Sequence, residues 1–232
     1  MERKSLVRIF FKNEVNTLRE KAEFMYDKQL KIMKVLNEAE GEVLRKIYVF
    51  SENKEVISNS IVKDFKKTIK SHTTIKNITD DYSDEFSNTC NFYLNKKAGS
   101  VLFSYGVMTE GISKKNSNLL IDKYERLPVM QSYESAKHFV YSLVDIFNPV
   151  TIEVMDSKLY SFEEKSKYDF WSGWMLYFDN SYTIPELPEW VKVETLPNGG
   201  HLIITTEEVF NPENNEHRER ARSLLNLLQL QR

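Results

Sequence analysis

The sequence has little of several residue types that usually mark a function or a division of the chain. Among its 232 residues there are one cysteine, Cys90, only 7 glycines and only 6 prolines. A single cysteine excludes an internal disulfide and a thiolate metal cluster within one chain, and it fits a reducing compartment. Because no stretch is rich in glycine or proline, nothing suggests a linker, and we expect one domain over residues 1–232.

Long apolar runs are also missing. No run reaches the roughly 18 to 20 residues that a membrane-spanning helix needs. The first residues, MERKSLVRIFFKNE, contain neither the uninterrupted apolar segment nor the small-residue cleavage site of a signal peptide. We therefore expect a cytoplasmic protein that has no membrane partner.

Recognisable catalytic patterns are absent from the sequence. Its four histidines show no HxH or HxxxH spacing, and neither GxSxG nor a glycine-rich phosphate loop occurs. We expect no metal and no cofactor. Neighbouring acids such as Glu207 and Glu208 normally point apart, which argues against a catalytic carboxylate pair. Asp156-Ser157-Lys158 resembles the acid-x-lysine fragment of restriction-type nucleases, so a small hydrolase or nuclease remains the main alternative.

Charge is distributed unevenly along the chain. Residues 150–217 contain 13 acidic residues and four lysines, a net charge of −9, whereas the whole chain carries only −2. This block is either a solvated face or a surface that attracts a basic partner. The last helix carries basic side chains that could contact phosphates, which leaves a nucleic-acid-binding module as a second alternative: Arg218, Arg220 and Arg222.

Hydrophobic periodicity predicts helices and strands along the whole chain. Residues 5–11 fit either a strand or the lead-in to a helix, residues 73–88 read as a loop, and Gly99 is expected in a turn with a positive φ. The last helix is expected to begin with Asn211 as N-cap and Pro212 as its first residue. Helices are expected at 13–41, 56–69 and 133–147, and strands at 46–51, 90–94, 100–108, 119–124, 150–155, 174–178, 190–196 and 201–206. We expect an α+β fold, an antiparallel sheet flanked by helices.

The stretch WSGWMLYF places two of the three tryptophans around a glycine. Gly173 permits a bulge or a close backbone approach, and Trp174 then shares a strand face with Leu176 and Phe178. A strand that is apolar on both faces is a central one. Trp171 stands at the entrance to this strand and could instead anchor a partner, because tryptophan is enriched at interface hot spots.

The same region resembles a known family. GWMLYF, followed by LPEWVKVETLPNGGHLIITTEEVFNPENNEHRERARSLLNLL, is similar to the immunity protein 52 family of bacterial polymorphic toxin systems. The likeness is clearest over residues 171–228, and residues 1–149 resemble the family only in general layout. The motif positions are expected to be structural: Gly173, Trp174, Tyr177, Gly199, Gly200, Thr205 and Thr206.

The resemblance implies a non-enzymatic antidote that binds a cognate protein toxin. Members of the family are associated with toxins of a restriction-endonuclease-like fold, which implies a nuclease target. An acidic surface can occupy the basic groove that a nuclease uses for phosphates, without direct contact between the antidote and nucleic acid. The candidate toxin-binding residues are Trp171, Glu207, Glu208, Glu213 and Glu216.

Overall fold

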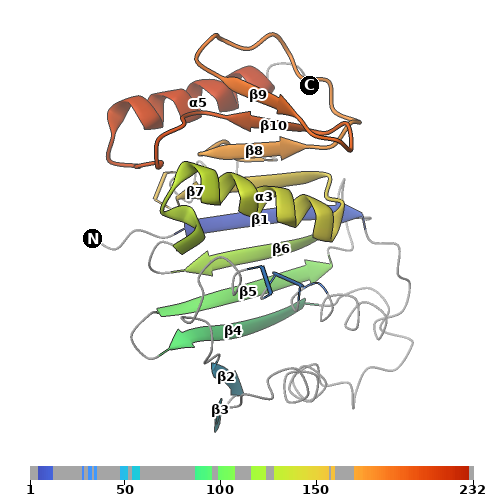
Figure 1. The fold of residues 1–232 in the computed structure, drawn as a ribbon, viewed down its shortest axis with the longest axis vertical. Helices are drawn as coiled ribbons and strands as arrows, with labels where there is room; N and C mark the ends of the chain where they lie inside the picture. Colours follow the sequence, from blue (N-terminus) through green and yellow to red (C-terminus); the bar gives the residue numbers. More distant parts are fainter. Residues whose placement is uncertain are drawn as a thin grey trace.

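A computed structural model gives the fold of the protein. It describes residues 5–12, 28, 31–32, 34–35, 48–51, 54–57, 87–95, 99–107, 116–123, 128–156, 158–159 and 170–229. Across these residues one sheet runs in the order β3-β2-β4-β5-β6-β1-β7-β8-β10-β9 (Figure 1). Every pairing in the sheet is antiparallel. Helices accompany the sheet, and the expected α+β class is confirmed.

Strands outnumber helices in the described part of the chain. The short helix η3 spans Pro128–Met130, and the two long helices of the described part are α3 (Tyr133–Phe147) and α5 (Asn215–Gln229). The strands are β1 (Ser5–Lys12), β2 (Tyr48–Ser51), β3 (Lys54–Ile57), β4 (Ser87–Asn95), β5 (Gly99–Val107), β6 (Asn116–Lys123), β7 (Thr151–Asp156), β8 (Met175–Phe178), β9 (Lys192–Thr195) and β10 (His201–Ile204).

Helix α3 lies across the middle of the sheet in Figure 1, and its sequence explains both ends. Ser132 is the N-cap, and its hydroxyl oxygen accepts a hydrogen bond from the Ser135 backbone N–H at 3.2 Å. Asn148 ends the helix in the left-handed region, with φ 43°. Pro149 follows and cannot continue the helix. The apolar stripe faces the core: Ala136, Phe139, Val140, Leu143, Val144 and Phe147.

Strand β8 lies between β7 and β10, and all four of its residues are buried. Leu202 of β10 pairs with both Tyr177 of β8 and Glu194 of β9, so these three residues point to one face. On that face the Tyr141 hydroxyl of α3 donates a hydrogen bond to the Glu194 carboxylate. The central position expected for the WSGWMLYF strand is therefore confirmed.

The face of β8 opposite to Tyr177 packs toward α5. The ring of Phe178 stacks on Tyr182 at 4.0 Å between centroids, and the Tyr182 hydroxyl donates to the Leu228 carbonyl of α5 at 3.2 Å. Buried leucines of α5 belong to the same apolar core as β8 and α3. Burial on both faces therefore fixes the register of this end of the sheet, because a slip by one residue would expose one apolar set.

Several sequence predictions need correction near element ends. Helix α5 starts at Asn215, so Asn211 is not its N-cap. Asn214 does the capping: its side-chain oxygen accepts from the Glu216 N–H at 2.9 Å. Asn211 instead accepts from the Glu213 N–H at 3.1 Å, a local turn that holds Pro212 outside the helix.

The first half of the chain also shows differences. The predicted helix over 56–69 is wrong at its start, because Val56 and Ile57 pair with β2 in the sheet. Gly99 begins β5 opposite Asn95 rather than standing in the turn. Residues 5–11 form a strand, the alternative left open, and the loop expected over 73–88 gives way to β4 at Ser87.

The other expectations for the first half hold where the structure describes them. The predicted helix over 13–41 is helical at its described residues, and Ile32 is fully buried, as its place on the apolar stripe requires. The remainder of that prediction, most of 56–69 and most of 73–88 lie outside the described residues. Cys90 lies on β4, as expected, whereas its burial is outside the described part.

Candidate interaction surface

The motif residues of the last third of the chain bind one another. The Thr205 hydroxyl donates to the Gly173 carbonyl at 2.8 Å and lies 3.1 Å from the Trp174 carbonyl, which also accepts from the Thr205 backbone N–H. The buried Trp174 indole donates to the Thr206 carbonyl at 3.0 Å. These contacts join the entrance of β8 to the exit of β10, so their role in this structure is to hold the sheet together.

Two glycines lie where a side chain has no room. A Cβ on Gly173 would lie 2.5 Å from the Met155 Cβ and 2.6 Å from the Val154 carbonyl oxygen. A Cβ on Gly200 would overlap the phenol ring of Tyr177, which is fully buried. Gly199 has φ +80°, a backbone conformation that glycine adopts without steric penalty. Close packing and turn geometry account for all three.

The ring of Trp171 packs against a partly buried ion pair that joins β1 and β7. Arg8 and Glu153 face each other across these strands, with the Arg8 Nε 2.6 Å and Nη2 2.9 Å from the carboxylate oxygens. The Arg8 guanidinium carbon lies 3.7 Å from the centroid of the Trp171 ring, within the range of a cation–π contact. Trp171 is half-buried, so its ring both covers this pair and reaches solvent.

Burial governs the proton affinity of Glu153, whose side chain is fully enclosed. Loss of hydration raises the pKa of Glu153 to about 7, against the opposing pull of the Arg8 charge and a backbone hydrogen bond from Trp171. Sequence reasoning missed this pair. A signal was present, because Arg8 and Glu153 are each flanked by apolar residues inside their strands, whereas the other charged residues, Lys12 and Asp156, stand at strand ends.

The four candidate glutamates all lie on or near the connection from β10 to α5. Each has an exposed side chain. Glu207 lies 2.5 Å from the Lys192 ammonium group, and this hydrogen bond lowers the pKa of Glu207. Glu216 pairs with Arg220 one turn along α5. Within the described part of the chain the Glu208 carboxylate has only the His217 ring as an ionisable neighbour, at 3.5 Å, and its side chain is 80% exposed. Two of the four acids are therefore compensated by cations.

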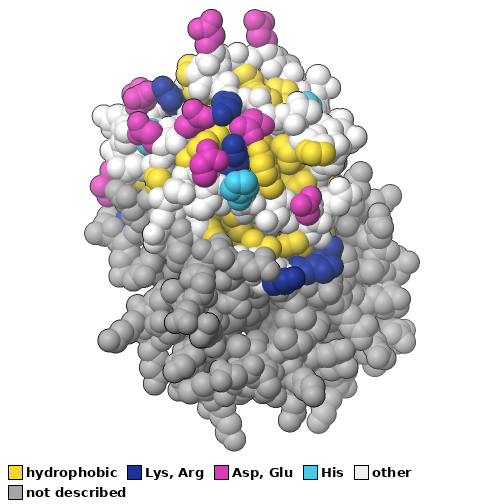
Figure 2. Space-filling model, viewed as in Figure 1, with side chains coloured by type: hydrophobic (Ala, Val, Ile, Leu, Met, Phe, Trp, Pro, Cys, Tyr) yellow, Lys and Arg dark blue, Asp and Glu magenta, His cyan; other side chains and the backbone are white. Residues whose placement is uncertain are grey.

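Charges of both signs also surround the contact of α3 with β9. Lys137 of α3 lies 3.4 Å from the Glu194 carboxylate, and Lys192 lies 3.3 Å from it. Burial and a hydrogen bond to Glu194 raise the pKa of Tyr141, which keeps that phenol neutral. Figure 2 shows acidic, basic and histidine side chains interspersed on this part of the surface, not a field of one sign.

Several side chains of the two alternative sites are engaged within the chain, although the buried Lys158 ammonium group has no hydrogen-bond partner among the described residues. Asp156 is buried at the end of β7, and its side chain accepts from the Lys158 backbone N–H at 3.0 Å. Arg218 donates to Asn215 on its own helix, and Arg220 contacts Glu216. Over the described ranges no group of three or more His, Cys, Asp or Glu side chains is placed to hold a metal ion. Nor does any helix there have the length and apolar character to cross a membrane.

Comparison with known proteins supports the family resemblance. Residues 130–231 match the model of the family described as Immunity protein 52. The match confirms the resemblance, and it extends further toward the N-terminus than the motifs over 171–228. It includes α3, β7, β8, β9, β10 and α5, and all five candidate toxin-binding residues lie within it.

Solved structures show the fold over a longer range. The Pseudomonas aeruginosa T6SS protein PA0821 superimposes with a TM-score of 0.59 at 9% sequence identity, covering 98% of this chain and 72% of that one. At this identity the likeness concerns the fold alone. A search of curated proteins found no match.

Proposed function

We propose that this chain is an immunity protein: one domain that binds a cognate toxin in the cytoplasm and neutralises it stoichiometrically, without catalysing a reaction itself. The observation that carries the proposal is the match of residues 130–231 to the Immunity protein 52 family. The proposed toxin is a nuclease of restriction-endonuclease-like fold. Such an enzyme needs a basic groove for phosphates, and a protein inhibitor with exposed carboxylates complements that groove.

The proposed contact surface is the connection from β10 to α5 together with Trp171. Glu207, Glu208, Glu213 and Glu216 are exposed there. The Thr206 hydroxyl accepts from the Glu208 N–H at 3.1 Å, and Asn211 fixes the Glu213 backbone, so two of the four acids project from an ordered segment. Order before binding favours affinity because less conformational entropy is lost.

The ion pairs that each glutamate already makes determine how much electrostatic free energy it can gain on binding the toxin. Glu207 and Glu216 already contact cations, so toxin binding must replace existing ion pairs at these positions. An exposed ion pair contributes only about 0–1 kcal/mol, so the replacement is feasible but gains little. Glu213 contacts no cation within the described residues, and Glu208 contacts only a histidine. Glu208 and Glu213 therefore offer the larger electrostatic gain.

The test has two stages. First, the tagged chain is co-purified with the product of the neighbouring open reading frame, and its co-expression is tested for rescue of cells from that toxin. Second, a Glu208→Ala/Glu213→Ala variant is compared with Glu207→Ala/Glu216→Ala. We expect the first variant to weaken toxin binding about tenfold or more and the second to weaken it less, with unchanged thermal unfolding of both.

A matched control removes two acids elsewhere. Glu186 and Glu189 are exposed in the connection between β8 and β9, so Glu186→Ala/Glu189→Ala deletes the same two charges outside the proposed surface. Toxin affinity should be unchanged in this variant. Equal affinity of all three variants and the wild type would show that the acidic connection is not the contact surface, whereas absence of both complex and rescue would overturn the immunity function itself.

A further inference from the structure

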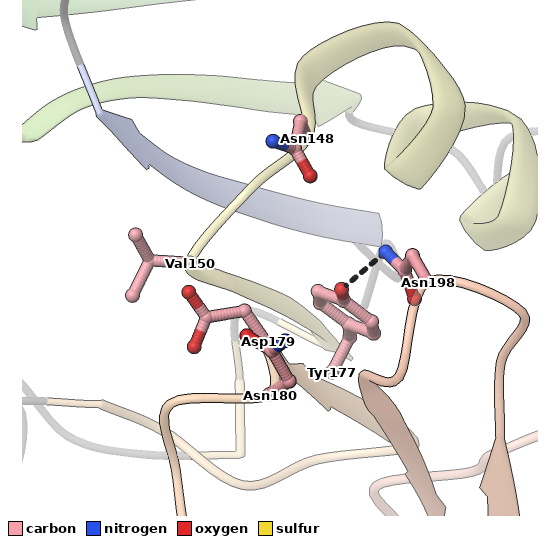
Figure 3. Close-up of a pocket in the computed structure, with 6 residues that line it drawn as sticks. All are labelled: Asn148, Val150, Tyr177, Asp179, Asn180 and Asn198. Atoms are coloured by element: carbon pink, nitrogen blue, oxygen red, sulfur yellow. Dashed lines mark hydrogen bonds between the residues drawn. The ribbon is translucent and has the colours of Figure 1, made fainter.

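A polar pocket opens at the end of the sheet where α3, β7, β8 and the β9–β10 turn meet. Its volume is about 320 Å³, and its lining, drawn in Figure 3, is Asn148, Val150, Tyr177, Asp179, Asn180 and Asn198. None of these residues belongs to the acidic connection described above. Three amides, one phenol and one carboxylate give the pocket hydrogen-bonding groups but almost no apolar wall.

Asp179 is the only charged side chain of the lining. Its Oδ1 is occupied, since it accepts from the Ser181 N–H at 3.1 Å and from the Ser181 hydroxyl at 2.5 Å. Its Oδ2 accepts no hydrogen bond among the described residues. In Figure 3 the carboxylate points toward Val150, on the side of the pocket where α3 ends. The pocket thus contains one carboxylate oxygen available to a ligand.

The end of α3 supplies a second acceptor. Asn148 is the C-cap of this helix, and the C-terminal end of a helix carries a partial negative charge. The last turn contains no basic residue of its own, but the Lys28 ammonium group donates to the Ile146 carbonyl there and offsets part of that charge. The Asn148 side chain makes no hydrogen bond within the part of the chain that the structure describes, so its amide oxygen is available. The free carboxylate oxygen of Asp179 and this amide oxygen together favour a cationic ligand.

The remaining groups are held in fixed positions. The Asn198 amide nitrogen donates to the Tyr177 hydroxyl at 2.8 Å, while its oxygen accepts from the Gly200 N–H at 3.0 Å. Burial, with a contribution from the Asp179 charge, raises the pKa of Tyr177 and keeps the phenol neutral. The acceptors are therefore separated around an open space rather than gathered at one point. A planar guanidinium with several donors fits this spread better than a compact, strongly hydrated ammonium.

We infer that this pocket binds one guanidinium group, presented as an arginine side chain by a protein partner. The identity of that partner rests on the proposed function, in which it is the toxin. The Asp179 Oδ2 accepts from the guanidinium, and Asn148 accepts from a second N–H. The pocket then forms a second contact point, separate from the connection between β10 and α5, and it selects arginine where the acidic connection selects only positive charge.

The pocket can be tested without the toxin. The full chain, labelled with ¹⁵N, is titrated with methylguanidinium chloride, and urea at the same concentrations serves as a planar uncharged control. We expect saturable shifts of the Asn148 and Asn198 side-chain amide signals with a dissociation constant in the millimolar range, as for other very small ligands. Urea should give no saturable shift. Equal responses to both compounds would overturn the inference.

Matched variants locate the binding group. Asp179→Asn keeps an oxygen for the Ser181 turn but removes the charge, and it should abolish the methylguanidinium response. Asp145→Asn removes an exposed acid of α3 that does not line the pocket, and it should leave the response unchanged. Asn148→Gly suits the left-handed backbone and should weaken binding several-fold. Wild-type binding by Asp179→Asn would refute the assignment.

The same variants identify the source of the guanidinium. With the toxin, Asp179→Asn should lower affinity at least tenfold and Asp145→Asn should not, because a hydrogen bond to a charged group is lost only in the former. Loss of methylguanidinium binding with unchanged toxin affinity would show that a free guanidinium compound is the ligand, against the partner assignment. If no toxin binds the wild type, the proposed function fails, while the titration still decides the pocket.

Discussion

Gly173→Ala should destabilise the protein strongly, because the new methyl group meets backbone. The added Cβ would lie 2.6 Å from the Val154 carbonyl oxygen and 2.8 Å from the Met155 Cα, and neither atom can rotate away. Relief requires β7 and the entrance of β8 to separate, which stretches the 2.8 Å hydrogen bond from the Trp174 N–H to Val154. Overpacking of about 1–3 kcal/mol and a lost hydrogen bond of about 1 kcal/mol give about 2–4 kcal/mol.

Urea unfolding followed by tryptophan fluorescence and circular dichroism measures this loss. For a chain of this length about 2–4 kcal/mol corresponds to a fall in Tm of roughly 4–16 °C. Gly199→Ala is the control: its Cβ would lie 3.4 Å from the nearest atom, so only the left-handed φ acts, at about 1–2 kcal/mol. A Gly173→Ala variant within about 0.5 kcal/mol of the wild type would refute the close-approach argument.

Two further changes test the contacts around this strand. Thr205→Val leaves the Trp174 carbonyl with its backbone partner but removes the hydroxyl donor to Gly173, so unfolding free energy should fall by about 1–3 kcal/mol, while Thr205→Ser restores most of it. The pKa of buried Glu153 is raised to about 7 from 4.5, so the folded state holds the proton more tightly than the unfolded state, and this contribution to stability is complete below about pH 4.5 and lost as pH rises through 7. Relative to Glu153→Gln, wild-type stability should decline by as much as about 3 kcal/mol across that interval in denaturation measured at several pH values. A difference between wild type and Glu153→Gln that does not vary with pH would contradict the burial account.

The sequence predicted α3 and the β9–β10 hairpin well because local and tertiary signals agree there. Helix α3 matches its predicted bounds, since Ser132 and Asn148-Pro149 mark its ends and its apolar stripe is uninterrupted. The β9–β10 hairpin follows from the turn residues before Gly200. The Leu196 N–H donates to the Gly200 carbonyl at 2.8 Å to close that turn.

Predictions failed where pairing between distant residues decides the structure. Val56 and Ile57 suit either a helix stripe or a strand, and only their pairing with Val49 and Tyr48 selects the sheet. Asn211 followed by Pro212 is a good helix start locally, yet the Asn211 N–H donates to the buried His217 ring at 2.9 Å and Asn214 takes over the cap. Such contacts leave no periodic signal in the sequence.

The candidate surface was likewise predictable only in part. Exposure of the four glutamates could be predicted from their position in a polar connection, but their pairing could not, since Lys192 lies on β9 and reaches Glu207 only through the fold. The pocket brings together Asn148 and Asn198, which are fifty residues apart in the chain. Their association depends on β7, β8 and β10 lying side by side.

The most direct test of the account is a titration of toxin activity against this chain. Purified toxin at a concentration far above the dissociation constant is mixed with increasing amounts of the chain, and residual activity is measured. Stoichiometric binding predicts a linear fall to zero with a sharp break at one chain per toxin. Full inactivation by substoichiometric amounts would mean turnover and hence an enzyme, and undiminished activity at any ratio would contradict neutralisation by binding.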